Sequence, residues 1–427
     1  MSAHLTPVAA LVVLLATPAA AQVVAITGGR VFPVSGPPID NATVVIRDGK
    51  IAAVGANVTV PDGAQRIDAT GKWVTPGLIN SATTLGLVEI SAVGETRDVS
   101  ARGRDAIAAA VTVWEGVNPI SAHIGPARED GMTSAVLMPD GGLIAGQAAL
   151  VDLVGTSVTD MVVRAPVAMV AEVGNAQAAN LGTRAELLVK LREILDDTRT
   201  YMRRRADYDR AQTRDFAASR LDLEAMIPVV QGRLPLLVQA DLAADIQAAL
   251  RLAREFSLKL MIAGGADAWR VADELAAARV PVLSGAMNNI PQSFATLGHR
   301  QENAALLRQR GVSVAIIGNA GGGEATDAFN ASNIRYEAGN AVAYGMTWDD
   351  ALRAVTLTPA ELFGVADRIG SLQPGRDANV VVWSGDPFEF ATRAEHVLIR
   401  GRELDVQTRP EQLMDRYMNL DSPYRRP

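Results

Sequence analysis

The side chains that could carry out chemistry are unevenly supplied in this sequence, because carboxylates are plentiful, histidines are few and cysteines are absent. The histidines are His4, His123, His299 and His396, and they lie far apart in the chain. Protein zinc sites are built from imidazole, thiolate and carboxylate ligands that converge on the ion. Four scattered histidines cannot form a multi-histidine zinc site, so we interpret His123 and His299 as ordinary surface or loop residues.

Carboxylates leave a different kind of metal site open, because a hard cation needs only oxygen ligands. The candidates near predicted strand ends are Glu89, Asp140, Glu172, Asp241, Asp267, Glu324 and Asp327. The alternative is that they are solvated loop or cap residues, since nothing in the sequence fixes their convergence.

Nucleophilic catalysis finds little support in the residue patterns. The chain has no Cys, no Gly-x-Ser-x-Gly turn and no His suitably near a Ser, so an activated nucleophile is not indicated. The run Gly321-Gly322-Gly323 follows a predicted strand, but no Lys-Ser/Thr comes after it, as a phosphate-binding loop requires. We interpret this run as a flexible loop over the mouth of the fold.

Composition favours a large packed domain and excludes some partners. The 427 residues are 48% hydrophobic but only 4% aromatic, which suits helices packed on parallel strands better than a base-stacking surface. The net charge of −7 argues against nucleic acid or anionic membranes as main partners.

The N-terminal segment is typical of an export signal. An apolar run, Ala9–Leu15, is followed by Ala19-Ala20-Ala21, a pattern that signal peptidase accepts. The run is too short to span a bilayer. We expect cleavage after Ala21, a periplasmic or extracellular location, and no membrane span in the mature chain.

Both ends of the mature chain are rich in predicted strands, whereas the middle alternates between strands and helices. Asp48-Gly49 between two β-rich runs predicts a hairpin, and strand-like runs return from Ala378 onward. Between these ends, segments such as Leu234–Val238 and Ala243–Phe256 repeat a strand–helix unit, which indicates a parallel sheet covered by helices. About 300 residues of such units favour a closed eightfold barrel over an open sheet.

Several motifs resemble those of the amidohydrolase superfamily over nearly the whole mature chain. Pro76-Gly77-Leu78-Ile79-Asn80 is similar to the family's opening signature, in which Pro-Gly-Leu-Ile-Asp leads into a His-x-His pair. Ala354–Ala360 resembles its penultimate helix, and Ile369–Asn379 resembles the return into its β-domain. The imidazolonepropionase-like and dipeptidase-like branch is the most similar. These motifs are turns, caps and packing positions, so they predict architecture.

The resemblance implies a TIM-type (β/α)₈ barrel with a small β-sandwich domain formed by both terminal segments. The predicted division is a signal peptide at 1–21, a composite β-sandwich at 22–75 plus 376–410, a barrel at 76–375 and a tail at 411–427. Family members hydrolyse non-peptide carbon–nitrogen bonds with zinc or another divalent metal, held by four histidines, a lysine and an aspartate. Glycine-rich loops border the pocket, and the matching residues here are Asp140, Gly141, Gly142 and Gln147, together with Gly321, Gly322 and Gly323.

At the positions that match the family's metal ligands, this chain carries other residues. By register these positions are Ala82, Thr84, Val170, Gln239, Gly264 and Asn319, with Asp241 beside the fourth. Methyl, hydroxyl and amide groups do not replace imidazoles on zinc. We therefore expect no metal or other cofactor and no family reaction. The expected role is that of a binding or partner subunit, which takes a small polar ligand and forms a homo-oligomer or a hetero-oligomer with an active paralogue. The alternative is an active hydrolase of cyclic amides or dipeptides with a rebuilt oxygen-ligand metal site near Asp241.

Overall fold

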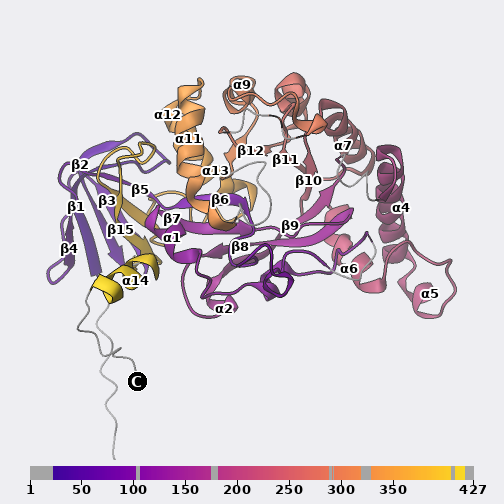
Figure 1. Ribbon diagram of the computed structural model, residues 1–427, viewed down its shortest axis with the longest axis horizontal. Coiled ribbons are helices and arrows are strands. Elements are labelled where there is room, and N and C mark those ends of the chain that lie inside the picture. The colour runs from indigo at the N-terminus through magenta and orange to yellow at the C-terminus, as the bar shows by residue number, and fades with distance from the viewer. Residues whose placement is uncertain are drawn as a thin grey trace, which may run out of the picture.

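The computed structural model describes residues 23–101, 106–174, 181–287, 291, 293–318, 328–404 and 409–418, and it consists of two sheets that lie side by side (Figure 1). The smaller sheet combines indigo strands from the N-terminal segment with yellow strands from the C-terminal segment. The larger sheet curls into a barrel whose outer side carries the helices. The chain thus forms a TIM-type barrel with a separate β-sandwich domain built from both terminal segments, as the sequence predicted.

The β-sandwich domain is one eight-stranded sheet with the order β16-β15-β14-β5-β1-β2-β3, in which β4 also pairs with β1. The N-terminal strands are β1 (Val23–Val31), β2 (Ile39–Arg47), β3 (Lys50–Gly55), β4 (Gln65–Asp68) and β5 (Trp73–Pro76). The C-terminal strands are β14 (Val380–Trp383), β15 (Ala394–Ile399) and β16 (Arg402–Glu403).

A hairpin turn and a strand pairing between the two terminal segments explain how this sheet forms. Asp48 and Gly49, at φ +51° and +76°, join β2 to β3, as a two-residue hairpin turn with both central residues in the left-handed region requires. Strand β14 then pairs antiparallel with β5, which brings Val382 opposite Val74 although the two lie in opposite terminal segments. Alternate side chains of these strands, including Ile26, Val44 and Val380, fill a core of their own.

The barrel sheet also has eight strands, in the order β13-β12-β11-β10-β9-β8-β7-β6. Strand β13 lies beside β6, so the sheet is nearly closed. The first four strands are β6 (Leu78–Thr83), β7 (Met132–Leu137), β8 (Ile144–Asp152) and β9 (Val162–Glu172). The other four are β10 (Leu236–Ala240), β11 (Leu260–Gly264), β12 (Val282–Ser284) and β13 (Val314–Ile316).

Helices cover the outside of the barrel, most regularly after β10. Those of the first half are α1 (Ile124–Glu129), α2 (Val158–Met161), α4 (Arg184–Arg203), α5 (Arg205–Asp209) and α6 (Arg220–Val230). Those of the second half are α7 (Ala243–Phe256), α8 (Ala272–Ala278), α9 (Asn303–Gln309), α11 (Ile334–Ala343), α12 (Trp348–Ala354) and α13 (Leu357–Leu362). Helix α14 (Arg409–Met418) lies beside the β-sandwich domain instead (Figure 1). No helix in the described ranges is long and apolar enough to cross a membrane.

Strand β8 departs from the regular strand–helix alternation. It runs antiparallel to both β7 and β9, and the six residues 138–143 connect it to β7. The sequence predicts a glycine-rich loop over Asp140–Gln147, whereas Ile144–Gln147 are the first residues of β8 in the structure. Ile144–Asp152 forms a strand because it is a nearly continuous apolar run. Such a run is stable when it is buried between two neighbouring strands.

The barrel interior is filled by small and medium apolar side chains. Ala168 and Val170 of β9 lie in one cluster with Leu237 of β10 and Ala263 of β11. Because residues two apart on a strand face the same side, the interior positions that follow toward the strand ends are Glu172, Gln239 and Gly265. The candidate site therefore lies at the carboxyl ends of the parallel strands.

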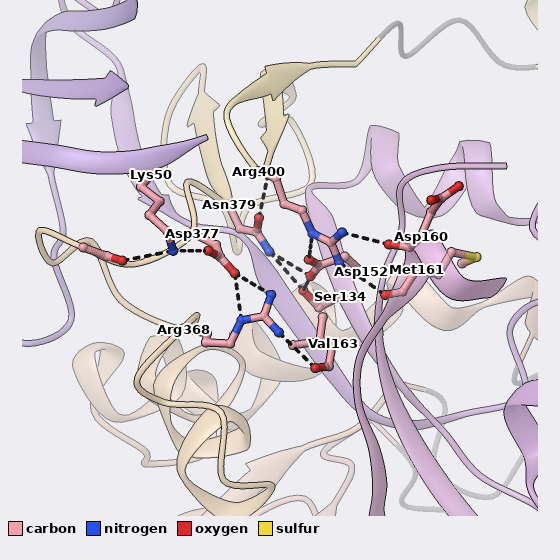
Figure 2. Close-up of polar contacts among 11 residues, drawn as sticks. Lys50, Ser134, Asp152, Asp160, Met161, Val163, Arg368, Asp377, Asn379 and Arg400 are labelled. Atoms are coloured by element: carbon pink, nitrogen blue, oxygen red, sulfur yellow. Dashed lines mark hydrogen bonds and ion pairs between the residues drawn. The ribbon is translucent and has the colours of Figure 1, made fainter. Parts of the chain in front are cut away.

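A buried polar network joins the barrel to the β-sandwich domain (Figure 2). The Asp152 carboxylate, which is fully buried at the end of β8, accepts hydrogen bonds from Ser134 at 2.7 Å and Asn379 at 3.0 Å. The Arg400 guanidinium contacts the other carboxylate oxygen at 2.7 Å. Both carboxylate oxygens of Asp152 thus have partners, which offset part of the cost of burying this group.

Candidate functional site

The end of β6 is the first part of the candidate site, and its buried amide side chain makes hydrogen bonds within the fold. Asn80 is fully buried, donates from Nδ2 to the Ala331 carbonyl at 2.8 Å and accepts the Ala82 N–H at 3.1 Å. Ala82 is partly buried against the barrel interior, and Thr84 is buried just beyond the strand. Asn80 therefore anchors the strand to the 3₁₀ helix η5 (Ala331–Asn333). The two positions of the family's His-x-His pair present a methyl and a hydroxyl group.

The ends of β9 and β10 bring a carboxylate and an amide side by side. Glu172 pairs in register with Gln239, and Val170 pairs with Leu237 two residues deeper. Val170 is buried within the interior cluster. Glu172 rather than Val170 is thus level with Gln239 at the barrel mouth.

Asp241 follows β10 directly and is held against the end of β11. Its Oδ1 accepts the Ala266 N–H at 3.2 Å, and its carbonyl accepts the Asp267 N–H at 2.8 Å. A Cβ on Gly264 would lie 2.6 Å from Oδ1 of Asp241, so the glycine leaves the space that this carboxylate occupies. Burial raises the pKa of Asp241 above its ordinary value, and the anionic neighbours Asp245 and Asp267 act in the same direction, against the Ala266 hydrogen bond and His299.

His299 belongs to this site, although the sequence predicts only an ordinary surface or loop residue at this position. It lies half-buried close enough to Asp241 and Asp267 for both carboxylates to favour its charged form, although burial lowers its pKa below the ordinary value. Its Nδ1 is buried without a hydrogen-bond partner. Trp269 Nε1 donates to the Gly298 carbonyl at 3.0 Å, which fixes the loop that carries the imidazole.

The predicted pocket loop at the end of β7 is well anchored. Asp140 Oδ1 accepts the Gly141 N–H at 2.8 Å, and Gly141 and Gly142 have φ of +86° and +75°. Gln147 on β8 donates to the Ala109 carbonyl at 3.0 Å. The Leu143 carbonyl accepts the Glu172 N–H at 3.1 Å, so this loop borders the mouth beside Glu172.

The remaining predicted positions lie outside the described residues. They are Asn319, Gly321, Gly322, Gly323, Glu324 and Asp327. Of the other candidate carboxylates, Glu89 accepts a hydrogen bond from Asn118 at 2.9 Å and takes no part in the Asp241 cluster. The ring of His123 contacts the Glu89 carbonyl at 3.1 Å instead.

The donor groups at these positions do not fit the metal centre that the resemblance implies. Ala82, Val170 and Gly264 offer no ligand atom, and Thr84 and Gln239 offer neutral oxygens where the family has imidazoles. Within the described part of the chain, no group of three or more His, Asp or Glu side chains is placed to hold a metal ion. The arrangement is suited to hydrogen bonding with a polar ligand through Gln239, Thr84 and the carboxylates.

Sequence similarity to known proteins is consistent with this fold. The profile of the amidohydrolase family matches residues 240–408. Amidohydrolase tasK of Hapsidospora irregularis is 22% identical over 376 residues, which are 80% of this chain but 37% of that protein. This chain therefore spans little more than a third of that relative. An imidazolonepropionase of Mesorhizobium japonicum is 22% identical over 398 residues, covering 81% of this chain and 87% of the relative.

A solved structure extends this agreement to three dimensions. The crystal structure of an amidohydrolase from Thermotoga maritima superposes with a TM-score of 0.81 at 27% identity. The match covers 90% of this chain and 99% of that one. With the barrel, the β-sandwich domain and the motifs that connect them in agreement, the chain belongs to the amidohydrolase superfamily.

Proposed function

We propose that this chain is a catalytically degenerate amidohydrolase that binds a small polar ligand at the barrel mouth without a metal and serves as a binding or partner subunit. The observation that carries the proposal is the set of side chains at the positions of the family's ligands, which are alanine, valine, glycine, threonine and glutamine. Without these imidazole ligands, the family's metal-bound hydroxide has no site in which to form.

Thr84 and Gln239 support the binding half of the proposal. The threonine hydroxyl and the glutamine amide can each donate and accept hydrogen bonds. Glu172, level with Gln239, adds an acceptor at the same edge. Such a lining recognises a neutral polar molecule by paired hydrogen bonds. A partner role is reasonable because a folded subunit that binds an active homologue stabilises it by mass action.

The test is to measure metal content and turnover on the same preparation. Protein purified without chelator is analysed for bound metals and assayed against cyclic amides and dipeptides, before and after chelator treatment. We expect substoichiometric metal and no turnover above a heat-denatured control. Stoichiometric metal together with chelator-sensitive turnover would overturn the proposal. Co-purification with an active homologue, measured by size-exclusion chromatography and mass spectrometry, tests the partner role.

A second candidate is an active hydrolase with a rebuilt site, and the proximity of His299 to Asp241 favours it. His299 is a half-buried imidazole whose Nδ1 lacks a partner, and it lies within electrostatic range of the Asp241 carboxylate, whose pKa burial raises. An imidazole and a carboxylate with perturbed pKa values are groups that general acid–base catalysis uses. If the candidate is right, Asp241→Asn and His299→Gln each abolish turnover of a cyclic amide. The exposed Asp349→Asn on α12 leaves that turnover unchanged. Failure to detect any turnover in the unsubstituted chain excludes this candidate.

A further inference from the structure

A pocket of about 640 Å³ opens at the end of the barrel opposite the candidate site. Its lining comes from the residues that precede or begin the parallel strands, including Arg233 before β10, Lys259 before β11 and Pro281 before β12. The end of α13 closes one side through Phe363. Because the candidate site lies at the carboxyl ends of the same strands, the body of the barrel separates the two.

The rim of this pocket is cationic. It carries Arg164, Arg233, Arg254, Lys259 and Arg279, and its single carboxylate is Glu361. Glu361 is already paired with Arg353, at 2.6 Å. In the described part of the chain, none of the five cations forms an ion pair with a carboxylate.

The contacts that these cations do make leave their charge uncompensated. Arg164 donates to the Gly364 carbonyl at 2.6 Å and Arg254 to the Leu250 carbonyl at 3.4 Å. Arg233 donates to the neutral amide oxygen of Gln231 at 2.7 Å. Carbonyl and amide oxygens carry partial charges only. Nearby surface arginines differ in this respect, since Arg310 contacts the Asp273 carboxylate at 2.6 Å.

The negative C-terminal ends of nearby helices offset part of the positive charge of these five cations, but not all of it. The C-terminal ends of α7, α8 and α13 meet at this pocket, and each carries about half a negative charge that a nearby cation offsets. With Glu361 included, the five cations still leave a surplus of about 2.5 positive charges at the rim. The surplus surrounds a concave surface, so it is available to a ligand.

The floor of the pocket is apolar. Leu234, Leu260 and Phe363 are each less than a tenth exposed, and Met261 and Val167 continue this surface toward the barrel interior. An apolar floor under a cationic rim matches a molecule with an apolar body and an anionic end. The volume lies within the range of small-molecule sites, about 300–1,000 Å³.

We propose that this pocket, defined by Arg164, Arg233, Arg254, Lys259 and Arg279 over Leu234, Leu260 and Phe363, binds a small organic anion with an apolar body. The charges hold a carboxylate, sulfonate or phosphate group at the rim, and the body occupies the floor. This site is separate from the barrel mouth and does not depend on the function proposed for it.

The test is a fluorescence titration of the full chain with 8-anilinonaphthalene-1-sulfonate, an anionic probe with an apolar body. We expect saturable binding at one site, competition by octanoate and no competition by uncharged octanamide at equal concentration. Binding weakens as salt rises, because the rim is exposed and its charges are screened. Binding to aggregated or partly unfolded chain is excluded by repeating the titration on monodisperse protein from size-exclusion chromatography.

Two variants test separately whether probe binding depends on the rim cations and on the open volume of the pocket. Lys259→Gln/Arg279→Gln removes two rim cations, and we expect probe affinity to fall about tenfold, a typical sum for two exposed charge contacts. Ala278→Trp, at an exposed position on the pocket wall, keeps all five charges but fills the pocket, and it should abolish binding. The matched control is Arg47→Gln/Arg66→Gln, which removes two exposed cations from the β-sandwich domain and leaves affinity unchanged.

Circular dichroism and thermal unfolding first check that all four proteins have the same fold, so that a change in affinity reports on the pocket. Equal affinity in the Lys259→Gln/Arg279→Gln variant and its control overturns the proposal, as does undiminished binding in Ala278→Trp. Cosedimentation with phosphatidylglycerol vesicles that depends on the same two cations, with no binding of the soluble probe, would replace the small anion by a membrane surface.

Discussion

The Arg400 guanidinium lies with its Nε 2.7 Å from Oδ2 of Asp152, although 248 residues separate the two in the chain. Asp152 ends barrel strand β8 and is fully buried, whereas Arg400 lies in the β15–β16 turn of the other domain and is partly exposed. Two further donations from Arg400, to the Asp160 and Met161 carbonyls at 2.8 and 3.4 Å, extend the contact. This ion pair is the centre of the junction between the two domains (Figure 2).

Replacing Arg400 with methionine should destabilise the fold strongly. The change keeps an apolar stem but leaves the buried Asp152 carboxylate without its cation, and we expect the free energy of unfolding to fall by about 3 kcal/mol. Burial already raises the pKa of Asp152 against the effect of Arg400, Ser134 and Asn379. Protonation of Asp152 is therefore favoured in the folded state, so the deficit of the variant shrinks as the pH falls toward the unfolded value of about 3.9.

The measurement is urea denaturation followed by circular dichroism at several pH values. The exposed Arg402→Met, two residues away on β16, is the control, with an expected change within about 0.5 kcal/mol. Adding Asp152→Asn to Arg400→Met should recover part of the loss. Equal effects of the two arginine substitutions would contradict the role assigned to the ion pair.

Asp377 should make the fold sensitive to acid. Burial alone would raise its pKa, but hydrogen bonds and charges from Lys50 at 2.8 Å and Arg368 at 2.8 Å outweigh it and hold the pKa of Asp377 below its ordinary value. A lowered folded-state pKa contributes stability above the unfolded value of about 3.9, and this contribution is lost as the pH falls below it. The difference in unfolding free energy between the unsubstituted chain and Asp377→Asn is thus largest at neutral pH and declines below about pH 4. Asp62→Asn, in an exposed turn, is the control; parallel curves for Asp377→Asn and the unsubstituted chain would refute the prediction.

His299 should titrate below the ordinary histidine value, because it is buried. Asp241 favours its charged form, so Asp241→Asn should lower the pKa of His299 further. Imidazole resonances in a two-dimensional NMR titration report this directly, and few histidines compete for assignment. Asp349→Asn, at an exposed position on α12, is the control. An unchanged His299 titration in Asp241→Asn would show that the two side chains are not electrostatically coupled.

Gly131 should not tolerate a side chain. Its φ is +78°, and a Cβ would lie 2.1 Å from Cη2 of the fully buried Trp383. We expect Gly131→Ala to lower the free energy of unfolding by about 2–4 kcal/mol, from overpacking and from left-handed backbone strain. Gly125→Ala in α1, where a Cβ meets nothing within 4 Å, should instead stabilise the helix by about 0.5–1 kcal/mol. Chemical denaturation of both variants checks the contrast, and similar values for the two would be inconsistent with it.

The fold was largely predictable because its signals are local or belong to family motifs. Asp48-Gly49 specified a hairpin through the backbone conformation that these residues tolerate. The direction of β8 was not predictable, since the apolar run Ile144–Asp152 is compatible with either orientation in a buried sheet. Direction depends on the length and geometry of the turn at Gly141 and Gly142, which periodicity does not contain.

The candidate site was predictable only in part. Sequence motifs located Gln239 and Asp241 at a strand end, but the depth of each residue in the barrel depends on strand register. That is why Glu172, and not Val170, is level with Gln239. The proximity of His299 to Asp241 depends on how two loops from different strand–helix units pack, so it left no signal in spacing. The cationic pocket likewise combines residues from several units.

The position of β5 between β1 and β14 has a consequence for biosynthesis. While the ribosome is still making the barrel, Trp73–Pro76 presents an unpaired strand edge whose partner, Val380–Trp383, has not yet been translated. Of the two domains, the β-sandwich domain therefore begins to emerge before the barrel but is completed after it. Until then, the exposed edge of β5 can pair with strands of other chains. A nascent chain stalled before Val380 should accordingly recruit chaperones through β5, and release them once β14 is added.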